Sequence, residues 1–155
     1  MANKITFQYA DRKLQVKNKT GIKSFAETLF SKEKASLKRV SYIFCSDDYL
    51  LDINKRFLKH DFYTDIITFG LSEKGEPVLA EIYISLDRVK DNAINMKKDF
   101  AEEVLRVIFH GVLHLCGYGD KTESEIKTMR AKEDFYIKQF HKVPRITVSS
   151  RNIWK

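Results

Sequence analysis

The chain contains little cysteine, glycine or proline. Two cysteines, Cys45 and Cys116, are too few for a disulfide scaffold, and both lie in apolar segments where small buried side chains are expected. With only 6 glycines and 2 prolines, the sequence has no flexible linker and no low-complexity stretch. No apolar run approaches the roughly 18 residues of a membrane span, and the first residues lack the apolar stretch of a secretory signal. A cytoplasmic protein is therefore expected.

The composition predicts one folded domain. The length of 155 residues is close to the commonest domain size, so a single domain over residues 1–155 is expected. Hydrophobic residues make up 43% of the chain and aromatic residues 12%, which excludes wholesale disorder. There are 28 Lys and Arg residues against 21 Asp and Glu residues, a formal net charge of +7. Such an excess favours polyanionic partners, nucleic acid above all.

Hydrophobic periodicity predicts an α+β fold, with an α/β sandwich as the alternative. The basic stretch from Arg12 to Lys19 predicts a turn region, and a basic tail runs from Pro144 to Lys155. Because several predicted strands are joined through helices, some parallel pairing is expected in a small mixed sheet of about four strands packed against about five helices. The strands are predicted over 5–9, 40–45, 64–69 and 79–85, and the helices over 22–30, 47–57, 86–96, 100–116 and 123–140.

The helix over 100–116 carries the residues that indicate chemistry. Its broad apolar face predicts a central buried helix. It also holds two of the 4 histidines, His110 and His114, which lie one helical turn apart and can bind one metal ion from the same side. Gly117 and Gly119 let the backbone double back after the second histidine, which can bring Asp120 over the first two ligands. The sequence therefore predicts a metal site made by His110 and His114 of this central helix together with Asp120, which follows the reversal.

Other interpretations of the histidine pair stay open. Two histidines at this spacing can also be surface decoration. A zinc peptidase of the H-E-x-x-H type is disfavoured, because Gly111 stands where its general-base glutamate would be. A structural zinc site would normally use cysteines, and Cys116 has the wrong spacing to join the histidines. Zinc is the expected ion, although another divalent ion can also occupy two imidazoles and a carboxylate.

Three blocks of this sequence resemble the YbeY family of bacterial rRNA maturation endoribonucleases. The first reads His-Gly-Val-Leu-His-Leu-Cys-Gly-Tyr over 110–118, and it matches the family signature H-G-x-L-H-L-x-G-Y at every specified place. The second is Asn54-Lys55-Arg56 followed by Thr-Asp-Ile-Ile-Thr-Phe over 64–69, and the third is Ala-Glu-Ile-Tyr-Ile-Ser over 80–85. The blocks occur in the family's order and extend over about half of the chain.

This sequence departs from the family pattern at the third metal ligand. The family usually has Asp and then His after the tyrosine, whereas this chain has Gly119 and then Asp120. Without a gap, Asp120 takes the position of the histidine ligand. An inserted residue would instead place Lys121 there, and an ammonium group cannot bind a metal ion. The ungapped alignment is therefore preferred, and the oxygen ligand lowers the Lewis acidity expected of the ion.

The resemblance implies a zinc-dependent endoribonuclease that cuts single-stranded RNA. Its expected roles are 16S rRNA 3′-end maturation and ribosome quality control, with RNA of the small ribosomal subunit as partner and no DNA or membrane. Arg56 corresponds to the family's arginine near the metal and is the expected catalytic residue, holding the scissile phosphate. The alternative function is a ribosome-associated assembly factor in which the metal is structural and no catalysis occurs.

Several other residues receive supporting roles. Thr64 and Asp65 are expected to support the strand and the surroundings of the site, and Tyr118 is expected to pack. Glu103 and Arg106 precede His110 on the same helix face, where they either hold an imidazole N–H or form a simple ion pair, the favoured interpretation. The two remaining histidines, at positions 60 and 141, are expected to be ordinary surface or packing residues.

Overall fold

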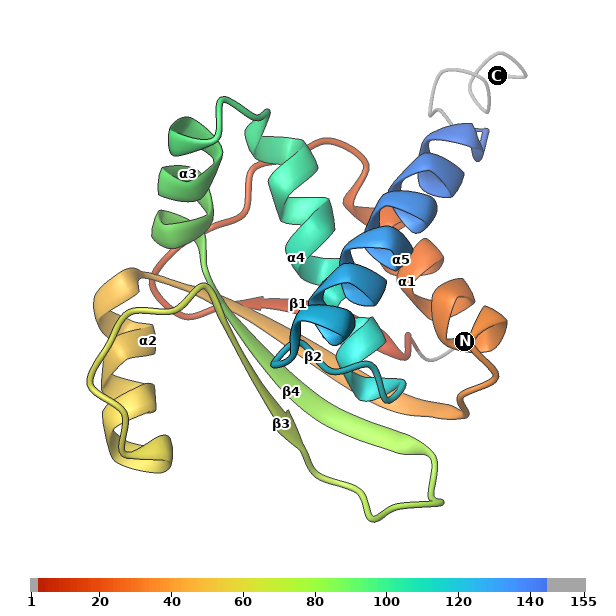
Figure 1. Cartoon of the computed structure of the whole chain (residues 1–155), viewed down its shortest axis with the longest axis horizontal. Coiled ribbons are helices and arrows are strands. Elements are labelled where there is room, and N and C mark those ends of the chain that lie inside the picture. The colour runs from red at the N-terminus through yellow and green to blue at the C-terminus, as the bar shows by residue number, and fades with distance from the viewer. Residues whose placement is uncertain (1–2, 145–155) are drawn as a thin grey trace, which may run out of the picture.

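The structure, a computed structural model, describes residues 3–144 (Figure 1). Of the basic tail predicted from Pro144 to Lys155, all but the first residue lies outside this range. Within residues 3–144, no helix combines the length and apolar character that crossing a membrane requires. The elements in chain order are β1 (Ile5–Tyr9), α1 (Lys19–Lys32), β2 (Leu37–Cys45), α2 (Asp47–Ile53), a π-helical turn η1 (Asn54–Leu58), β3 (Ile66–Gly70), β4 (Val78–Ser85), α3 (Leu86–Asn95), α4 (Phe100–Leu115) and α5 (Glu123–Lys142).

The strands form one mixed sheet in the order β1-β2-β4-β3. β1 pairs with β2 and β2 pairs with β4 in parallel, whereas β3 and β4 form an antiparallel hairpin. The parallel neighbours β1 and β2 are connected through α1, as such pairs require a crossover. The predicted α+β fold with a small mixed sheet and about five helices is therefore confirmed.

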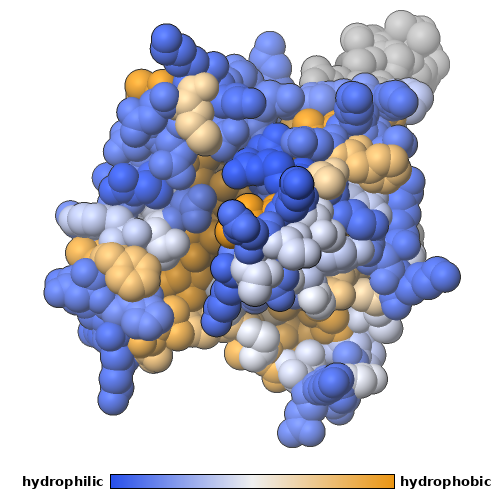
Figure 2. All heavy atoms as spheres, viewed as in Figure 1, coloured by the Kyte–Doolittle hydropathy of each residue, from blue (hydrophilic) through white to orange (hydrophobic). Residues whose placement is uncertain are grey.

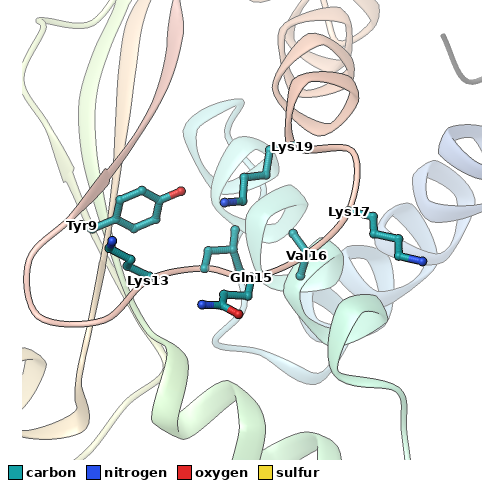
Figure 3. A pocket seen from close by; sticks show the side chains of 7 residues that line it. Tyr9, Lys13, Gln15, Val16, Lys17 and Lys19 are labelled. Atoms are coloured by element: carbon teal, nitrogen blue, oxygen red, sulfur yellow. The ribbon is translucent and has the colours of Figure 1, made fainter. Parts of the chain in front are cut away.

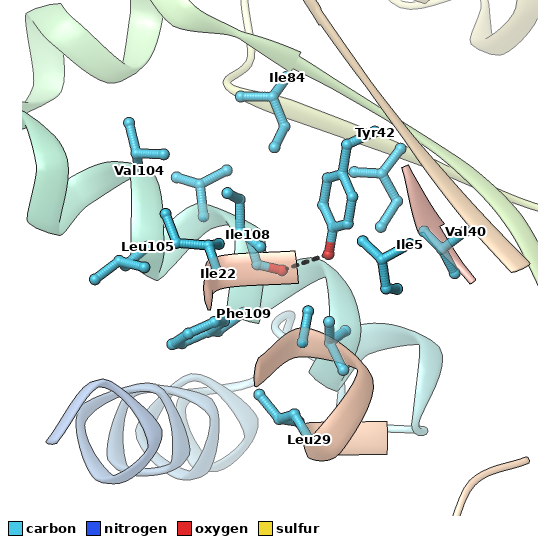
Figure 4. Packing of buried hydrophobic residues seen from close by; sticks show 14 of the residues in the cluster. Ile5, Ile22, Leu29, Val40, Tyr42, Ile84, Val104, Leu105, Ile108 and Phe109 are labelled. Carbon is cyan, nitrogen blue, oxygen red and sulfur yellow. Dashed lines mark hydrogen bonds between the residues drawn. The ribbon is translucent and has the colours of Figure 1, made fainter. Parts of the chain in front are cut away.

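Helices α1, α3, α4 and α5 gather on one side of the sheet, and α2 lies apart from them (Figure 1). Alternate residues of the strands face α4, and its own apolar stripe packs on them in the main hydrophobic core. The buried hydroxyl of Tyr42 on β2 donates a hydrogen bond of 2.8 Å to the carbonyl oxygen of Ile108 on α4 (Figure 4). This bond ties the middle of the sheet to the helix that carries the histidines.

The opposite face of the sheet has a smaller core beneath α2. Cys45 of β2 and Ile67 of β3 pack there against Leu50 and Ile53 of α2. Ser46 is the N-cap of α2 and its hydroxyl accepts a hydrogen bond of 3.1 Å from the backbone N–H of Tyr49. The cap fixes where the helix begins after β2.

Several boundaries differ from those that the sequence predicts: α1 (Lys19–Lys32) extends beyond 22–30 at both ends, and β2 begins at Leu37 rather than at residue 40. Two further differences arise from specific contacts. The helix predicted over 47–57 changes to a π-helical turn at Asn54, whose buried side-chain amide donates a hydrogen bond of 2.8 Å to the carbonyl oxygen of Phe62. The strand predicted over 64–69 begins at Ile66. The carbonyl oxygen of Asp65 still accepts a 2.9 Å bond from the N–H of Ser85, which holds the residue beside β4. Both differences depend on contacts with distant residues, which local propensity does not contain.

Candidate active-site cleft

A polar cleft of about 530 Å³ lies between α3, α4, α5 and the start of β3. Figure 2 shows it as a hollow between α3 and α5, with apolar atoms at its floor and polar side chains along its rim. Three polar residues of α4 reach it from one stripe of that helix: Glu103, Arg106 and His110. Its other polar lining residues come from four separate segments, namely Thr64, Asp65, Asn92, Asp120, Arg130 and Glu133.

Both ring nitrogens of His110 face carboxylates. Its Nδ1 lies 2.8 Å from Oε2 of Glu133 on α5, and its Nε2 lies 3.2 Å from Oδ2 of Asp120 in the loop that follows α4. The His110 side chain is 22% exposed, so one of its sides is open to the cleft. The imidazole is therefore fixed between a buried acceptor behind it and a more exposed one in front.

Glu133 is held by a second partner on α4. Only 5% of its side chain is exposed, and Oε1 accepts a 2.9 Å hydrogen bond from Nη1 of Arg106. Arg106 also donates from Nη2 to Asp134 at 2.7 Å, whereas its Nε is 3.9 Å from Glu103. The favoured interpretation of Arg106 as a simple partner of Glu103 is therefore incomplete, because its shorter contacts run to α5 and through Glu133 to His110.

Burial and the charges of the cleft together shift the pKa values of His110 and Asp65. Burial by itself lowers the pKa of His110, but the hydrogen bond to Glu133 and the charges of Glu133, Asp120 and Asp65 outweigh it and raise the pKa. Burial raises the pKa of Asp65, and the neighbouring His110 offsets this only in part. Asp65 thus belongs to the electrostatic surroundings of His110, in line with the supporting role expected from its sequence.

The predicted reversal after α4 brings Asp120 back to His110. Gly117 adopts a φ of 106°, a left-handed conformation that ends the helix. The N–H of Tyr118 then bonds to the carbonyl oxygen of Leu113 at 3.1 Å. Gly119 lies against the carboxylate of Glu125, and a Cβ atom there would come within 2.6 Å of it. The two glycines of the motif therefore serve different purposes, one the turn and the other a close approach to α5.

The three predicted metal ligands are not gathered into one cluster. His110 and Asp120 lie together, but His114 is exposed in the last turn of α4 and does not line the cleft. In the part of the chain that the structure describes, no group of three or more His, Cys, Asp or Glu side chains is arranged to hold an ion. The structure thus pairs two of the three predicted ligands, and the complete ligand set stays a prediction.

Arg56 lines a different hollow. It lies in η1, is 68% exposed and pairs with Asp52 at 3.3 Å. Its hollow, about 420 Å³, is formed by α2, η1 and the outer face of β3 and β4, and includes Phe57 and Tyr83. The structure therefore does not place Arg56 among the lining residues of the His110 cleft, and its catalytic role stays a prediction.

Tyr118 packs, as expected, and also anchors the reversal. Its hydroxyl donates a 2.8 Å hydrogen bond to Glu33 at the end of α1. The same carboxylate accepts a bond from the hydroxyl of Tyr136 and one of 3.2 Å from Lys132, both on α5. We call these four residues the Glu33 clamp. The clamp joins the loop that carries Asp120 to two helices.

Glu133 is the partner of His110 that sequence reasoning misses. The signal for it is a carboxylate within the buried stripe of α5, which otherwise contains Met129, Tyr136 and Ile137. A buried carboxylate requires a partner. Finding that partner requires the packing of α5 on α4, which periodicity does not give.

Comparison with known proteins connects this architecture with a family of RNA-cleaving enzymes. The sequence profile of the family described as Endoribonuclease YbeY matches residues 4–141. An Endoribonuclease YbeY of Cytophaga hutchinsonii is 48% identical over 130 residues, covering 84% of this chain and 91% of its own. One of Flavobacterium psychrophilum is 42% identical over 137 residues, covering 88% of this chain and 96% of its own.

A solved structure gives the same result for the fold. The solution structure of a Thermotoga maritima protein superposes with a TM-score of 0.62 at 28% sequence identity, covering 88% of each chain. Fold and sequence together define a member of a class of hydrolases that act on RNA. The chain belongs to the YbeY family of endoribonucleases.

Proposed function

We propose that this chain is a metal-dependent endoribonuclease that cuts single-stranded RNA. Its proposed role is in the cytoplasm, in 16S rRNA 3′-end maturation and ribosome quality control, with RNA of the small ribosomal subunit as substrate. The observation that carries the proposal is the His110–Asp120 pair at the mouth of a polar cleft in a member of this family. The net charge of +7 is consistent with a phosphate-rich substrate.

The donor atoms of the paired residues fit a zinc ion. Two ligands of one tetrahedral zinc ion are separated by about 3.3 Å, given metal–ligand bonds of about 2.0–2.1 Å. His110 Nε2 and Asp120 Oδ2 are 3.2 Å apart. His114, on the next turn of α4, is the proposed third ligand. When bound, zinc would polarise the scissile phosphodiester and lower the pKa of a bound water molecule.

The remaining residues of the cleft would orient and balance this site. Glu133 would accept a hydrogen bond from the Nδ1–H of His110 and so leave Nε2 free to bind the metal, the arrangement that fixes metal-binding imidazoles in many proteins. Arg106 holds Glu133 in place through its hydrogen bond of 2.9 Å. Arg130, which also lines the cleft, provides a cation within it for a phosphate, and Arg56 is proposed to hold the RNA strand from the neighbouring hollow.

Metal content and RNA cleavage test the proposal together. Purified wild-type protein should contain one divalent ion per chain and cut a single-stranded RNA. Asp120→Ala and His114→Ala should each lower metal affinity by at least about tenfold and reduce cleavage in parallel, because removing one of three ligands weakens the site. Elemental analysis and a cleavage assay with end-labelled RNA provide the two measurements.

His141→Ala is the matched control, since His141 is an exposed histidine that pairs with Glu102 at 2.7 Å, outside the cleft lining. It should leave metal content and cleavage unchanged. Wild-type protein without stoichiometric metal would contradict the proposal. Variants that lose metal and stability but retain RNA processing in cells would support the assembly factor with a structural metal instead.

A further inference from the structure

A second, strongly basic surface lies away from the His110 cleft, where the chain leaves β1 and enters α1. Here Lys13, Lys17 and Lys19 line an open hollow of about 430 Å³ beside Tyr9. In Figure 3, Lys13 and Lys19 extend toward the Tyr9 ring, while Lys17 extends away from it. We call the three lysines the β1–α1 lysine patch. None of its residues lines the His110 cleft.

The backbone beneath the patch is anchored, although it is neither helix nor strand. Leu14, between the first lysine and the others, is fully buried in the main core. Asn18 adopts a left-handed conformation and accepts a 3.2 Å hydrogen bond from the N–H of Gly21, which caps α1. The lysines therefore extend from a fixed support, so a ligand would not have to order the chain first.

The positive charge of the patch is not neutralised locally. No carboxylate lines the hollow, and the first turn of α1 contains no acidic residue. Within residues 3–144, none of the three lysines forms an ion pair. The nearest carboxylate in sequence, Asp11, accepts hydrogen bonds from Ser46 instead. Like charges kept together without a counter-charge favour a polyanion.

Tyr9 adds a feature that suits a nucleic acid strand. It is 39% exposed, and Nζ of Lys19 lies 5.6 Å from the centre of its ring. The ring stacks on Phe44, with the ring centres 5.9 Å apart, and Lys19 lies over it. An unpaired base can stack on its exposed part when Lys19 moves from the ring to an adjoining phosphate. A protein or membrane partner would not require this combination of ring and cations.

Protection of the sheet edge does not explain the patch. Among the described strands, β1 pairs only with β2 and so lies at the edge of the sheet, and lysines on such strands discourage pairing with another chain. The three lysines, however, follow β1 and do not lie on it. We propose that the β1–α1 lysine patch is a second RNA-binding surface that holds a single-stranded segment of the substrate outside the cleft. The identity of the polyanion as RNA rests on the proposed function.

The salt dependence of RNA binding tests this surface. Affinity of the full-length protein for a labelled, unstructured single-stranded RNA is measured by fluorescence anisotropy over a series of salt concentrations. A plot of log affinity against log salt has a negative slope. In Lys13→Gln/Lys17→Gln/Lys19→Gln, this slope should become shallower by about 2, since each lost phosphate contact on a single strand removes about 0.7 from its magnitude. Lys→Arg at the same three positions should preserve the slope, because it keeps the charge.

Lys74→Gln/Lys98→Gln/Lys138→Gln is the matched control. These lysines are exposed and form no ion pair within residues 3–144, and the triple change removes the same charge. The control should change the slope little. If both triple variants reduced the magnitude of the slope equally, the proposal would be overturned. If the triple patch variant aggregates, the three single substitutions are measured instead. Each should reduce the magnitude of the slope by about 0.7, and unchanged slopes in the single variants would overturn the proposal.

Cleavage separates this inference from the proposed function. The patch variant should cut RNA with an unchanged kcat and a raised KM, because the cleft is intact. A wild-type protein that binds RNA through the patch but cuts none would contradict the proposed function and leave the patch supported. If the wild-type protein cuts RNA and its salt slope equals that of the patch variant, only the proposal of RNA binding at the patch would be overturned.

Discussion

Glu33 shows how one carboxylate on a side chain that is only 10% exposed can hold three elements together. It receives hydrogen bonds from Tyr118 in the reversal and from Lys132 and Tyr136 on α5. Burial by itself raises the pKa of Glu33, but the bonds from Tyr136, Tyr118 and Lys132 outweigh it, so the pKa lies below its ordinary value. Its ionised form is therefore the one that stabilises the fold.

Glu33→Gln should lower the free energy of unfolding by about 2 kcal/mol at neutral pH, since the charge-assisted hydrogen bonds to this partly buried carboxylate are lost. A folded-state pKa below the unfolded value stabilises the protein at pH values above the unfolded pKa. This contribution disappears as pH falls through the folded pKa. The difference between wild type and variant should therefore shrink below about pH 4. Urea denaturation at several pH values measures it.

Glu27→Gln is the control for this substitution. Glu27 is exposed on the same helix, and among the described residues it makes neither an ion pair nor a side-chain hydrogen bond. Its replacement should change stability by less than about 0.5 kcal/mol. A stability difference for Glu33→Gln that stayed constant down to strongly acidic pH would show that lost packing, rather than lost charge, is responsible.

Among the secondary-structure elements, the start of α3 connects the strands with the helices. Ser85 ends β4 and is fully buried, and its hydroxyl accepts from the N–H of Arg88 at 3.1 Å and donates to Asp47 at 2.7 Å. Asp47 in turn accepts from Nη2 of Arg88 at 2.8 Å. One serine thus caps α3 and ties it to the first turn of α2.

Ser85→Ala should lower the free energy of unfolding by about 1–2 kcal/mol, through loss of the cap and of the bond to Asp47. Ser124→Ala, an exposed serine inside the first turn of α5, should have an effect near zero. Thermal or urea denaturation of the two variants checks this. Equal effects would mean that the Ser85 hydroxyl contributes no more than a surface group.

Local signals in the sequence account for α4 and its end, but not for what surrounds His110. The 3.6-residue period places His110 on α4, and Gly117 marks the reversal, because both are properties of neighbouring residues. Glu133 and Arg106 meet only when α5 packs on α4, and Asn54 starts a π-helical turn through its bond to Phe62. Such contacts depend on tertiary packing, so periodicity could not predict them.

At the scale of the whole molecule, stability should be greatest in the centre of the sheet. β2 and β4 each pair with strands on both sides, whereas β1 is an edge strand, and α4 is buried against the sheet. Amide hydrogen exchange should therefore be slowest in β2, β4 and α4, with opening free energies close to that of global unfolding. Exchange in α2 and η1 should be faster, and equally slow exchange there would contradict this ranking.

Both partners of the His110 imidazole come later in the chain than His110 itself. Asp120 follows in the reversal, and Glu133 lies near the middle of α5. During synthesis the ribosome makes the histidines first and the residues that orient His110 afterwards. Until α5 has emerged and packed on α4, the growing polypeptide therefore lacks both carboxylate partners of His110, so the proposed active site assembles late in synthesis.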